Sequence, residues 1–325
     1  MAKINIEELS QISYLNLKEV QGRFIASLMF HDAGEWRMWM AADDRLISVK
    51  AWPAEAFYFS RNAESETDIY LHFLDFIAQR ASFLELEKPF SGLHDDILNL
   101  ATSFAKLEHL HSTRDVIGTG VSRMVVTEIE YLFSVCRSIF DLLQEIVCVI
   151  WKAIQLTDTS VEKKPLKETF SKMMFFQGRE ATSDDLISRY GLPQPLADYY
   201  VRNRNFFFTL RKFRDAVIHR GTQVQTVFQG DTDFLIRRLM QPFSDMSVWT
   251  EEEVQPNDLV PLRPALSIVV YKTLSACEDF SSTLQEIIRF PEPLVPEMRL
   301  FMRCYFNEAF SRAINDANRR LMSHA

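Results

Sequence analysis

Glycine is scarce in this chain, and the scarcity limits the folds open to it. Only 9 glycines occur in 325 residues, where an average share of about 7% would give roughly 23. The 12 prolines are also fewer than the roughly 16 expected at about 5%. A chain with so few residues for tight turns is more easily built from long helices than from a many-stranded sandwich or barrel.

The low glycine count also bears on function. Neither the G-x-x-x-x-G-K-[ST] pattern of phosphate-binding loops nor the G-x-G-x-x-G pattern of dinucleotide-binding folds occurs in the sequence. P-loop NTPases and Rossmann dehydrogenases are therefore disfavoured. The net charge of −8 argues against a uniformly basic nucleic-acid-binding protein, but it leaves room for a local basic patch.

Cysteine usage and hydropathy favour a reduced, cytoplasmic protein. None of the four cysteines belongs to a C-x-x-C pair, so neither a zinc ribbon nor a redox motif is expected. Residues 1–13 lack the apolar core of a secretory signal. The most apolar stretch, 139–151, is interrupted by Asp141 and Glu145 and is too short to span a bilayer. We expect no membrane association, no metal and no cofactor.

The first third of the chain is the hardest to assign. Apolar runs at 22–30, 36–41 and 46–59 surround the turn signal Asp32-Ala33-Gly34. They are short enough to be either strands or buried helices, because periodicity does not separate the two at this length. From about residue 64 the apolar residues follow steps of three to four, which is typical of helices.

The remaining two thirds are dominated by helical patterns. The strongest covers 121–156, and its continuous apolar stripe would extend for about 50 Å at 1.5 Å per residue. A hairpin is predicted around the polar turn at 229–233. Further helices are predicted at 93–111, 165–174, 183–189, 195–219, 265–289 and 296–322.

These patterns predict a mainly α protein with two regions. Residues 1–115 would form an aromatic-rich N-terminal region, mixed or helical, with short strands and then two helices. Residues 116–325 would form an antiparallel helical bundle with a small β-hairpin.

One segment differs in charge from the rest of the chain. Residues 198–220 contain six basic and two acidic side chains, a local balance of +4, with six aromatic residues between them. Basic groups interleaved with aromatic rings suit phosphate contact and base stacking. An amphipathic helix with buried phenylalanines and solvated arginines has the same composition, and this structural alternative stays open.

Within this segment, Arg214 is followed by Asp215 and, after four intervening residues, by His219. Gly221 comes directly afterwards, at the position expected of a helix C-cap. A second R-x4-H, from Arg319 to His324, lacks this context.

The first pattern resembles the HEPN superfamily (higher eukaryotes and prokaryotes nucleotide-binding), whose small α-helical bundles carry an Arg, often a polar residue after it, and a His after four to six residues. The long helix at 121–156 is similar to the first core helix of that family, and the resemblance covers about residues 118–290.

The resemblance implies an activity and a set of roles. HEPN proteins that cleave RNA act as dimers without a metal: the 2′-hydroxyl attacks the adjacent phosphate and leaves a 2′,3′-cyclic end. By this resemblance His219 would be the general acid or base, Arg214 would bind the phosphate, and Asp215 would orient the histidine. Such proteins commonly serve in toxin–antitoxin or antiviral systems.

Five further residues are predicted to contact the substrate. They are basic residues of the same helix and acidic residues of the long helix that could line one groove with Arg214: Arg211, Lys212, Arg220, Asp141 and Glu145. The structural alternative makes Arg211 and Asp215 a surface ion pair and His219 a cap of the helix dipole.

Three functions follow from these readings. The first is a dimeric, metal-independent RNA endonuclease. The second is a non-catalytic HEPN-like module that binds a nucleotide, RNA or a protein partner such as an antitoxin. The third is a helical scaffold or regulatory protein.

Overall fold

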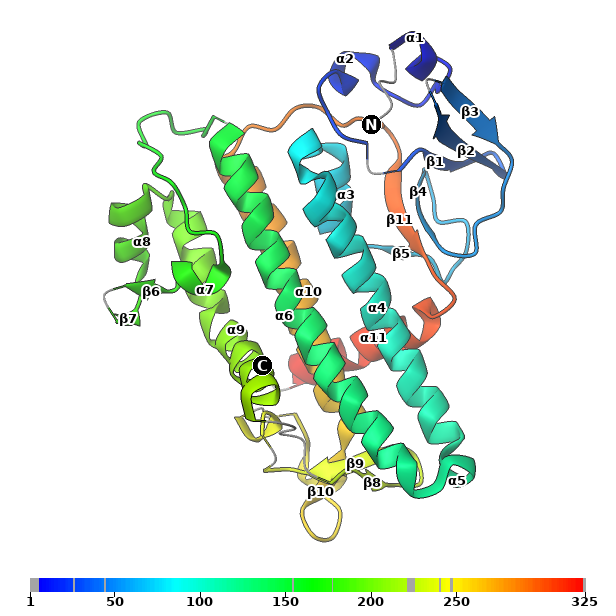
Figure 1. Cartoon of the computed structure of the whole chain (residues 1–325), viewed down its shortest axis with the longest axis vertical. Helices are drawn as coiled ribbons and strands as arrows, with labels where there is room; N and C mark the ends of the chain where they lie inside the picture. Colours follow the sequence, from blue (N-terminus) through cyan, green and yellow to red (C-terminus); the bar gives the residue numbers. More distant parts are fainter. Residues whose placement is uncertain are drawn as a thin grey trace. The chain divides into compact units, whose positions relative to one another are not determined.

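The chain is described by a computed structural model (Figure 1). It describes residues 6–25, 27–43, 45–153, 155–176, 178–220, 226–239, 241–245 and 248–323, with the side chains of 215–220 and 245 left out.

Two compact units are each assembled from three separate segments of the chain. Unit 1 comprises Met1–His94, Leu142–Tyr200 and Cys277–Asn307, and unit 2 comprises Asp95–Asp141, Val201–Ala276 and Glu308–Ala325. Four long helices contribute residues to both units: α4 (Glu87–Ser112), α6 (Val121–Ala153), α9 (Gln194–Arg220) and α10 (Leu262–Ile287). The division of the chain at residues 115 and 116 stays a prediction.

Unit 1 contains a six-stranded mixed sheet in the order β3-β2-β1-β4-β11-β5. Strand β1 pairs in parallel with β4, whereas the other neighbours are antiparallel. Figure 1 shows β11, which comes from near the C-terminus, between β4 and β5. The strands are β1 (Met29–Asp32), β2 (Glu35–Ala42), β3 (Arg45–Val49), β4 (Ala56–Ser60), β5 (Ile69–Tyr70) and β11 (Arg299–Arg303).

Local sequence explains the first hairpin of this sheet. Ala33 and Gly34 both have positive φ, at 51° and 80°, and Asp32 pairs with Glu35 across the turn. Two residues with positive φ form the tight connection that matches the twist of paired strands. The turn expected at Asp32-Ala33-Gly34 is therefore confirmed, and parts of the apolar runs around it form strands β1 to β4.

Shorter elements complete unit 1. Gly191 ends helix α8 in the left-handed conformation, with φ of 64°, as a glycine C-cap does. Strands β6 (Phe175–Phe176) and β7 (Arg179–Glu180) form a separate two-stranded sheet. The helices are α1 (Ile6–Leu9), α2 (Leu17–Val20), α3 (His72–Gln79), α7 (Phe170–Met173) and α8 (Ser183–Tyr190).

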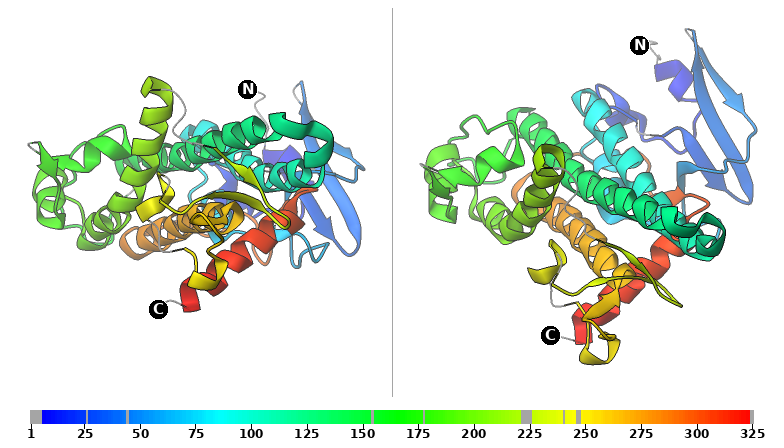
Figure 2. Two further views of the ribbon diagram at one scale, coloured as in Figure 1. Left: turned by 90° about the horizontal axis from the view of Figure 1, so that it is seen from below. Right: turned by 60° about the horizontal axis from the view of Figure 1, so that its bottom comes forward.

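Unit 2 is built around parts of the long helices, together with α5 (Arg114–Ile117) and all but the first residue of α11 (Asn307–Ser323). Helix α11 lies beside α10 (Figures 1 and 2), and the Tyr271 hydroxyl of α10 donates to Asn318 of α11 at 2.9 Å. A three-stranded antiparallel sheet joins β8 (Phe228–Gln229), β9 (Phe234–Arg237) and β10 (Leu259–Pro261). The hairpin expected around residues 229–233 is confirmed as β8 and β9.

The expectation of a mainly α fold with a small hairpin is wrong. The six-stranded sheet and the two smaller sheets make this an α/β fold. One cause is the segment 299–303, where apolar residues match a helical spacing but form β11 in the interior of the sheet. A second cause is the ambiguity of the short apolar runs before residue 60.

No helix in the described residue ranges combines the length and the apolar character needed to cross a lipid bilayer.

Candidate nucleic-acid interface

Aromatic side chains hold α6 and α9 together in unit 2. The rings of Phe133 and Phe213 lie 4.4 Å apart between centroids, and those of Phe140 and Phe207 lie 5.6 Å apart. Higher residue numbers on α6 meet lower numbers on α9, so the two helices run antiparallel. Such paired, buried rings contribute packing beyond the area that they bury. Phe207 and Phe213 of residues 198–220 therefore serve the core, as the structural alternative expects.

A polar cluster lies along this helix pair and consists of Arg137 and Asp141 of α6 with Arg211 and Arg214 of α9. We call it the α6–α9 arginine cluster. Arg137 Nη1 lies 2.7 Å from Asp141 Oδ2, one helical turn away. Arg214 and Arg211 lie close enough for their positive charges to act on the Asp141 carboxyl. Asp141 thus has three guanidinium groups around it.

Burial dominates the electrostatics of Asp141. It raises the pKa of the Asp141 carboxyl above the usual range, although the attraction of Arg137, Arg214 and Arg211 lowers it in part. The free energy lost when this carboxylate leaves water exceeds the free energy gained from its interactions with the arginines. Such a balance is common for part-buried ion pairs. The cluster is therefore a partly desolvated site in which charges interact strongly.

Two polar atoms of the cluster have no hydrogen-bond partner among the described residues. They are Nε of Arg137 and Oδ1 of Asp141, and both are buried. Three guanidinium groups and one carboxylate give these four side chains a balance of +2. An anion with several acceptor oxygens, such as a phosphate, matches this positive balance and the buried Nε donor of Arg137.

The structure brings together part of the predicted site. Arg211, Arg214 and Asp141 belong to one cluster, and Lys212 is exposed on α9. The side chains of the predicted residues Asp215, His219 and Arg220 lie outside the described residues, as does all of Gly221.

Arg137 is absent from the predicted site residues. Its spacing of four residues from Asp141 on the predicted long helix is the signal that could have added it.

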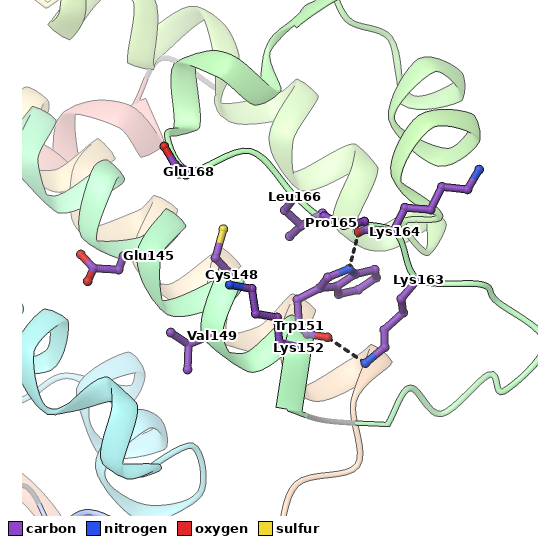
Figure 3. A pocket seen from close by; sticks show the side chains of 10 residues that line it. All are labelled: Glu145, Cys148, Val149, Trp151, Lys152, Lys163, Lys164, Pro165, Leu166 and Glu168. Carbon is purple, nitrogen blue, oxygen red and sulfur yellow. Dashed lines mark hydrogen bonds between the residues drawn. The ribbon is translucent and has the colours of Figure 1, made fainter.

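Glu145 belongs to unit 1 and lines a different site. It is one of ten residues around a hollow of about 470 Å³ between the end of α6 and the extended segment 163–168 (Figure 3). The indole of Trp151 donates to the Lys164 carbonyl at 3.0 Å, and the ammonium of Lys163 donates to the Trp151 carbonyl at 2.7 Å. Of the other predicted site residues whose side chains are described, none lines this hollow.

The thiol of Cys148 faces the same hollow but is a poor nucleophile. Burial raises the pKa of Cys148, and the thiolate is the reactive form. Lys152 and Lys163 lie at the C-terminus of α6, where cations stabilise the helix dipole. These features give the basic residues of the hollow a structural explanation.

Two of the histidines outside α9, His94 and His111, also have structural explanations. His94 stacks on Phe57 with 3.8 Å between ring centroids, and burial lowers the pKa of His94 to about 3. His111 Nε2 lies 3.0 Å from the Gly230 carbonyl oxygen of the β8–β9 turn. Within the described residues, no group of three or more His, Cys, Asp or Glu side chains could hold a metal ion.

Comparison with known proteins found no matching family model, no similar curated protein and no similar solved structure.

Proposed function

We propose that this protein is an RNA endonuclease that works without a metal and uses Arg214, Asp215 and His219. The observation that carries the proposal is the α6–α9 arginine cluster, where Arg214 shares its surroundings with two further arginines and one carboxylate. This grouping supplies charge-assisted donors for a phosphodiester, which is the group that an RNA endonuclease must bind.

The proposed reaction is an internal transfer at phosphorus. The 2′-hydroxyl loses its proton to a base, its oxygen forms a bond to the adjacent phosphorus, and the bond from phosphorus to the 5′-oxygen breaks. The products are a 2′,3′-cyclic phosphate and a 5′-hydroxyl, which takes up a proton. His219 would transfer a proton, and Arg214 would stabilise the charge that develops on the phosphate oxygens.

Helix geometry supports the assignment of Asp215. Residues 215 and 219 are one turn apart on α9, so they share a face of the helix. A carboxylate beside an imidazole fixes its tautomer and favours its protonated form. Because the observed fold is α/β, the proposal depends on this local motif and not on a helical-bundle fold. A homodimer that brings two motifs together, and a role in toxin–antitoxin or antiviral systems, belong to the same proposal.

The decisive experiment compares wild-type protein, Arg214→Ala and His219→Ala on a labelled single-stranded RNA of 20 nucleotides in the presence of EDTA. We expect loss of cleavage by about 10²–10⁴-fold for His219→Ala and about 10²–10³-fold for Arg214→Ala. Wild-type products should end in a 2′,3′-cyclic phosphate. Sedimentation velocity on the same samples measures whether the active species is a dimer.

Matched controls come from the chain itself. Arg202→Ala removes an exposed arginine from the same helix, and His324→Ala removes the histidine of the second R-x4-H. Both should cleave like wild type. Cleavage that survives either Arg214→Ala or His219→Ala contradicts the assignment, and RNA binding without any cleavage favours the non-catalytic module.

A further inference from the structure

A second arginine-rich site lies in unit 2, at helices α10 and α11. A hollow of about 520 Å³ is bounded by one face of α11, the first turn of α10 and the end of the β8–β9 turn. We call it the α11 hollow. Four arginines line it: Arg263, Arg312, Arg319 and Arg320.

The amphipathic pattern of α11 places these groups. Phe310, Ala313 and Ala317 are buried, and they recur at helical spacing on the face turned towards the core. Arg312 and Arg319 are seven residues apart and therefore lie on one side of the helix, two turns from each other. Because Arg320 neighbours Arg319, helix α11 brings three guanidinium groups to the hollow.

Carboxylates behind the arginines hold their guanidinium groups in place. Glu108 accepts from Arg263 at 3.1 Å and from Arg312 at 2.9 Å, one arginine on each oxygen. Glu253 takes two parallel hydrogen bonds from Arg320, at 2.7 and 2.9 Å, and Asp316 accepts a third at 2.9 Å. A guanidinium fixed in this way loses less conformational freedom when it binds a ligand.

The exposed fractions of the charged side chains indicate which of them a ligand would contact first. The side chains of Arg312 and Arg319 are 53% and 79% exposed, whereas those of Glu108, Asp316 and Glu253 are 30%, 30% and 25% exposed. Glu308, 75% exposed and 3.7 Å from Arg312, is an acidic group on the same side of α11. The most exposed charged groups here are therefore Arg312, Arg319 and Glu308, and Glu108, Asp316 and Glu253 are less exposed.

The N-terminus of α10 also borders the hollow. Pro261, Arg263 and Pro264 line the hollow where this 26-residue helix begins. The positive end of a helix dipole attracts anions and phosphates in particular. The Arg263 amide already donates to the carboxylate of Asp233 at 2.8 Å, so Asp233 occupies this end of the helix and the arginines of α11 must supply the attraction for a further anion.

We propose that the α11 hollow binds a phosphate group, with Arg312 and Arg319 as its first contacts. The backbone of the RNA is the source that we favour for this phosphate, and that choice rests on the proposed function. In this role the hollow would contact a phosphate at a distance along the strand from the cleaved bond. It would strengthen binding of long substrates without taking part in the chemistry.

The test compares Arg312→Ala/Arg319→Ala with Arg37→Ala/Arg45→Ala, a pair that removes two exposed arginines from β2 and β3 and gives the same net charge. Affinity for a 20-nucleotide oligouridylate is measured against salt concentration, with His219→Ala also present so that the RNA stays intact. Two lost phosphate contacts should lower the slope of log K against log [salt] by about 1.4, at about 0.7 per contact for a single strand. Affinity at low salt should fall by about tenfold, whereas the control pair should stay within about twofold.

Two further arms identify the source of the phosphate and guard against misfolding. ATP is titrated into the same proteins: loss of ATP binding in Arg312→Ala/Arg319→Ala, with RNA affinity unchanged, would assign the hollow to free nucleotides and overturn the RNA source. Asn315→Glu adds a carboxylate to the lining without removing an ion pair, and it should weaken the same binding. Unchanged affinity for both RNA and ATP in these variants overturns the phosphate site.

Failure of this inference is separable from failure of the proposed function. A trinucleotide is too short to reach a remote phosphate site, so Arg312→Ala/Arg319→Ala in an otherwise wild-type chain should cleave it at the wild-type rate. If the wild-type chain cleaves no RNA while the two arginines still govern RNA binding, the nuclease proposal fails and the phosphate site stands.

Discussion

The α6–α9 arginine cluster and the α11 hollow both gather arginines in unit 2, but they are built in opposite ways. In the cluster, three arginines surround the part-buried Asp141, on two helices that packed phenylalanine rings hold together. In the hollow, the arginines are held by Glu108, Glu253 and Asp316 through hydrogen bonds. The cluster therefore carries a surplus of charge on a rigid apolar support, and the hollow carries nearly balanced charge in a fixed geometry.

This contrast assigns different roles to the two sites. A surplus of guanidinium groups in a partly desolvated place suits strong binding at a reacting phosphate. A balanced network with exposed guanidinium edges suits a weaker contact that adds affinity along a strand.

The largest expected effect comes from the apolar support of the cluster. Phe133 is fully buried and touches Phe213 and Phe243, so Phe133→Ala should lower the free energy of unfolding by about 3–5 kcal/mol. Arg319→Ala, which removes one exposed side chain at the hollow, should change it by less than about 1 kcal/mol. Urea denaturation measures both, and equal losses would show that the two sites do not differ in their support.

The next prediction concerns RNA affinity after one carboxylate is neutralised at each site. The two changes in affinity should have opposite signs. Asp141→Asn raises the balance of the cluster from +2 to +3, so RNA affinity at low salt should rise by about fivefold, as roughly 1 kcal/mol of added attraction implies. Glu108→Gln also removes one negative charge, but it frees Arg263 and Arg312 from their anchor; the lost preorganisation should outweigh the charge gained at these more exposed arginines, and affinity should fall by about two- to threefold. Titration of both variants against the same oligouridylate checks the signs, and two changes of the same sign contradict the comparison.

A smaller effect is expected in the pH dependence of stability. Burial raises the pKa of Asp141, so its contribution to stability is full below the unfolded pKa of about 3.8 and is lost as pH rises through the folded pKa. The hydrogen bonds from Arg320 lower the pKa of Glu253, so its contribution is present above the unfolded pKa of about 4.5 and is lost as pH falls through the folded pKa.

Two variants separate these trends. At pH 7, Asp141→Asn should be at least as stable as wild type, whereas Glu253→Gln should be less stable. Both differences should shrink at pH 3, where the wild-type Asp141 is protonated and the Glu253 ion pair is weakened. Thermal unfolding at the two pH values measures them, and a Glu253→Gln variant that keeps wild-type stability at pH 7 contradicts the assignment.

Sequence patterns predicted the long helices well and the sheet poorly. The helix α6 repeats apolar residues over many turns, so its periodicity is unambiguous. The strand β11 has five residues and pairs with β4, more than 230 positions earlier in the chain. Pairing at that separation leaves no local signal, and its apolar residues match a helical spacing equally well.

The candidate sites show the same contrast between signals carried by long helices and contacts made only by the tertiary fold. Arg214, Arg211 and Asp141 lie on long helices whose pairing the sequence suggested, and the structure gathers them. The α11 hollow could not be predicted, because Arg263 comes from α10 and Glu108 from α4, and only the tertiary fold brings them to α11. The pattern Arg312, Arg319 and Arg320 on one helix was the available signal.

The most direct test of the central claim is the salt dependence of RNA binding by Arg214→Ala. The account predicts weaker binding of a 20-nucleotide RNA and a slope of log K against log [salt] smaller by about 0.7, the share of one phosphate contact on a single strand. Arg37→Ala, on β2 of unit 1, should leave both quantities unchanged. Wild-type affinity and slope in Arg214→Ala would contradict the claim that the α6–α9 arginine cluster binds the RNA phosphate.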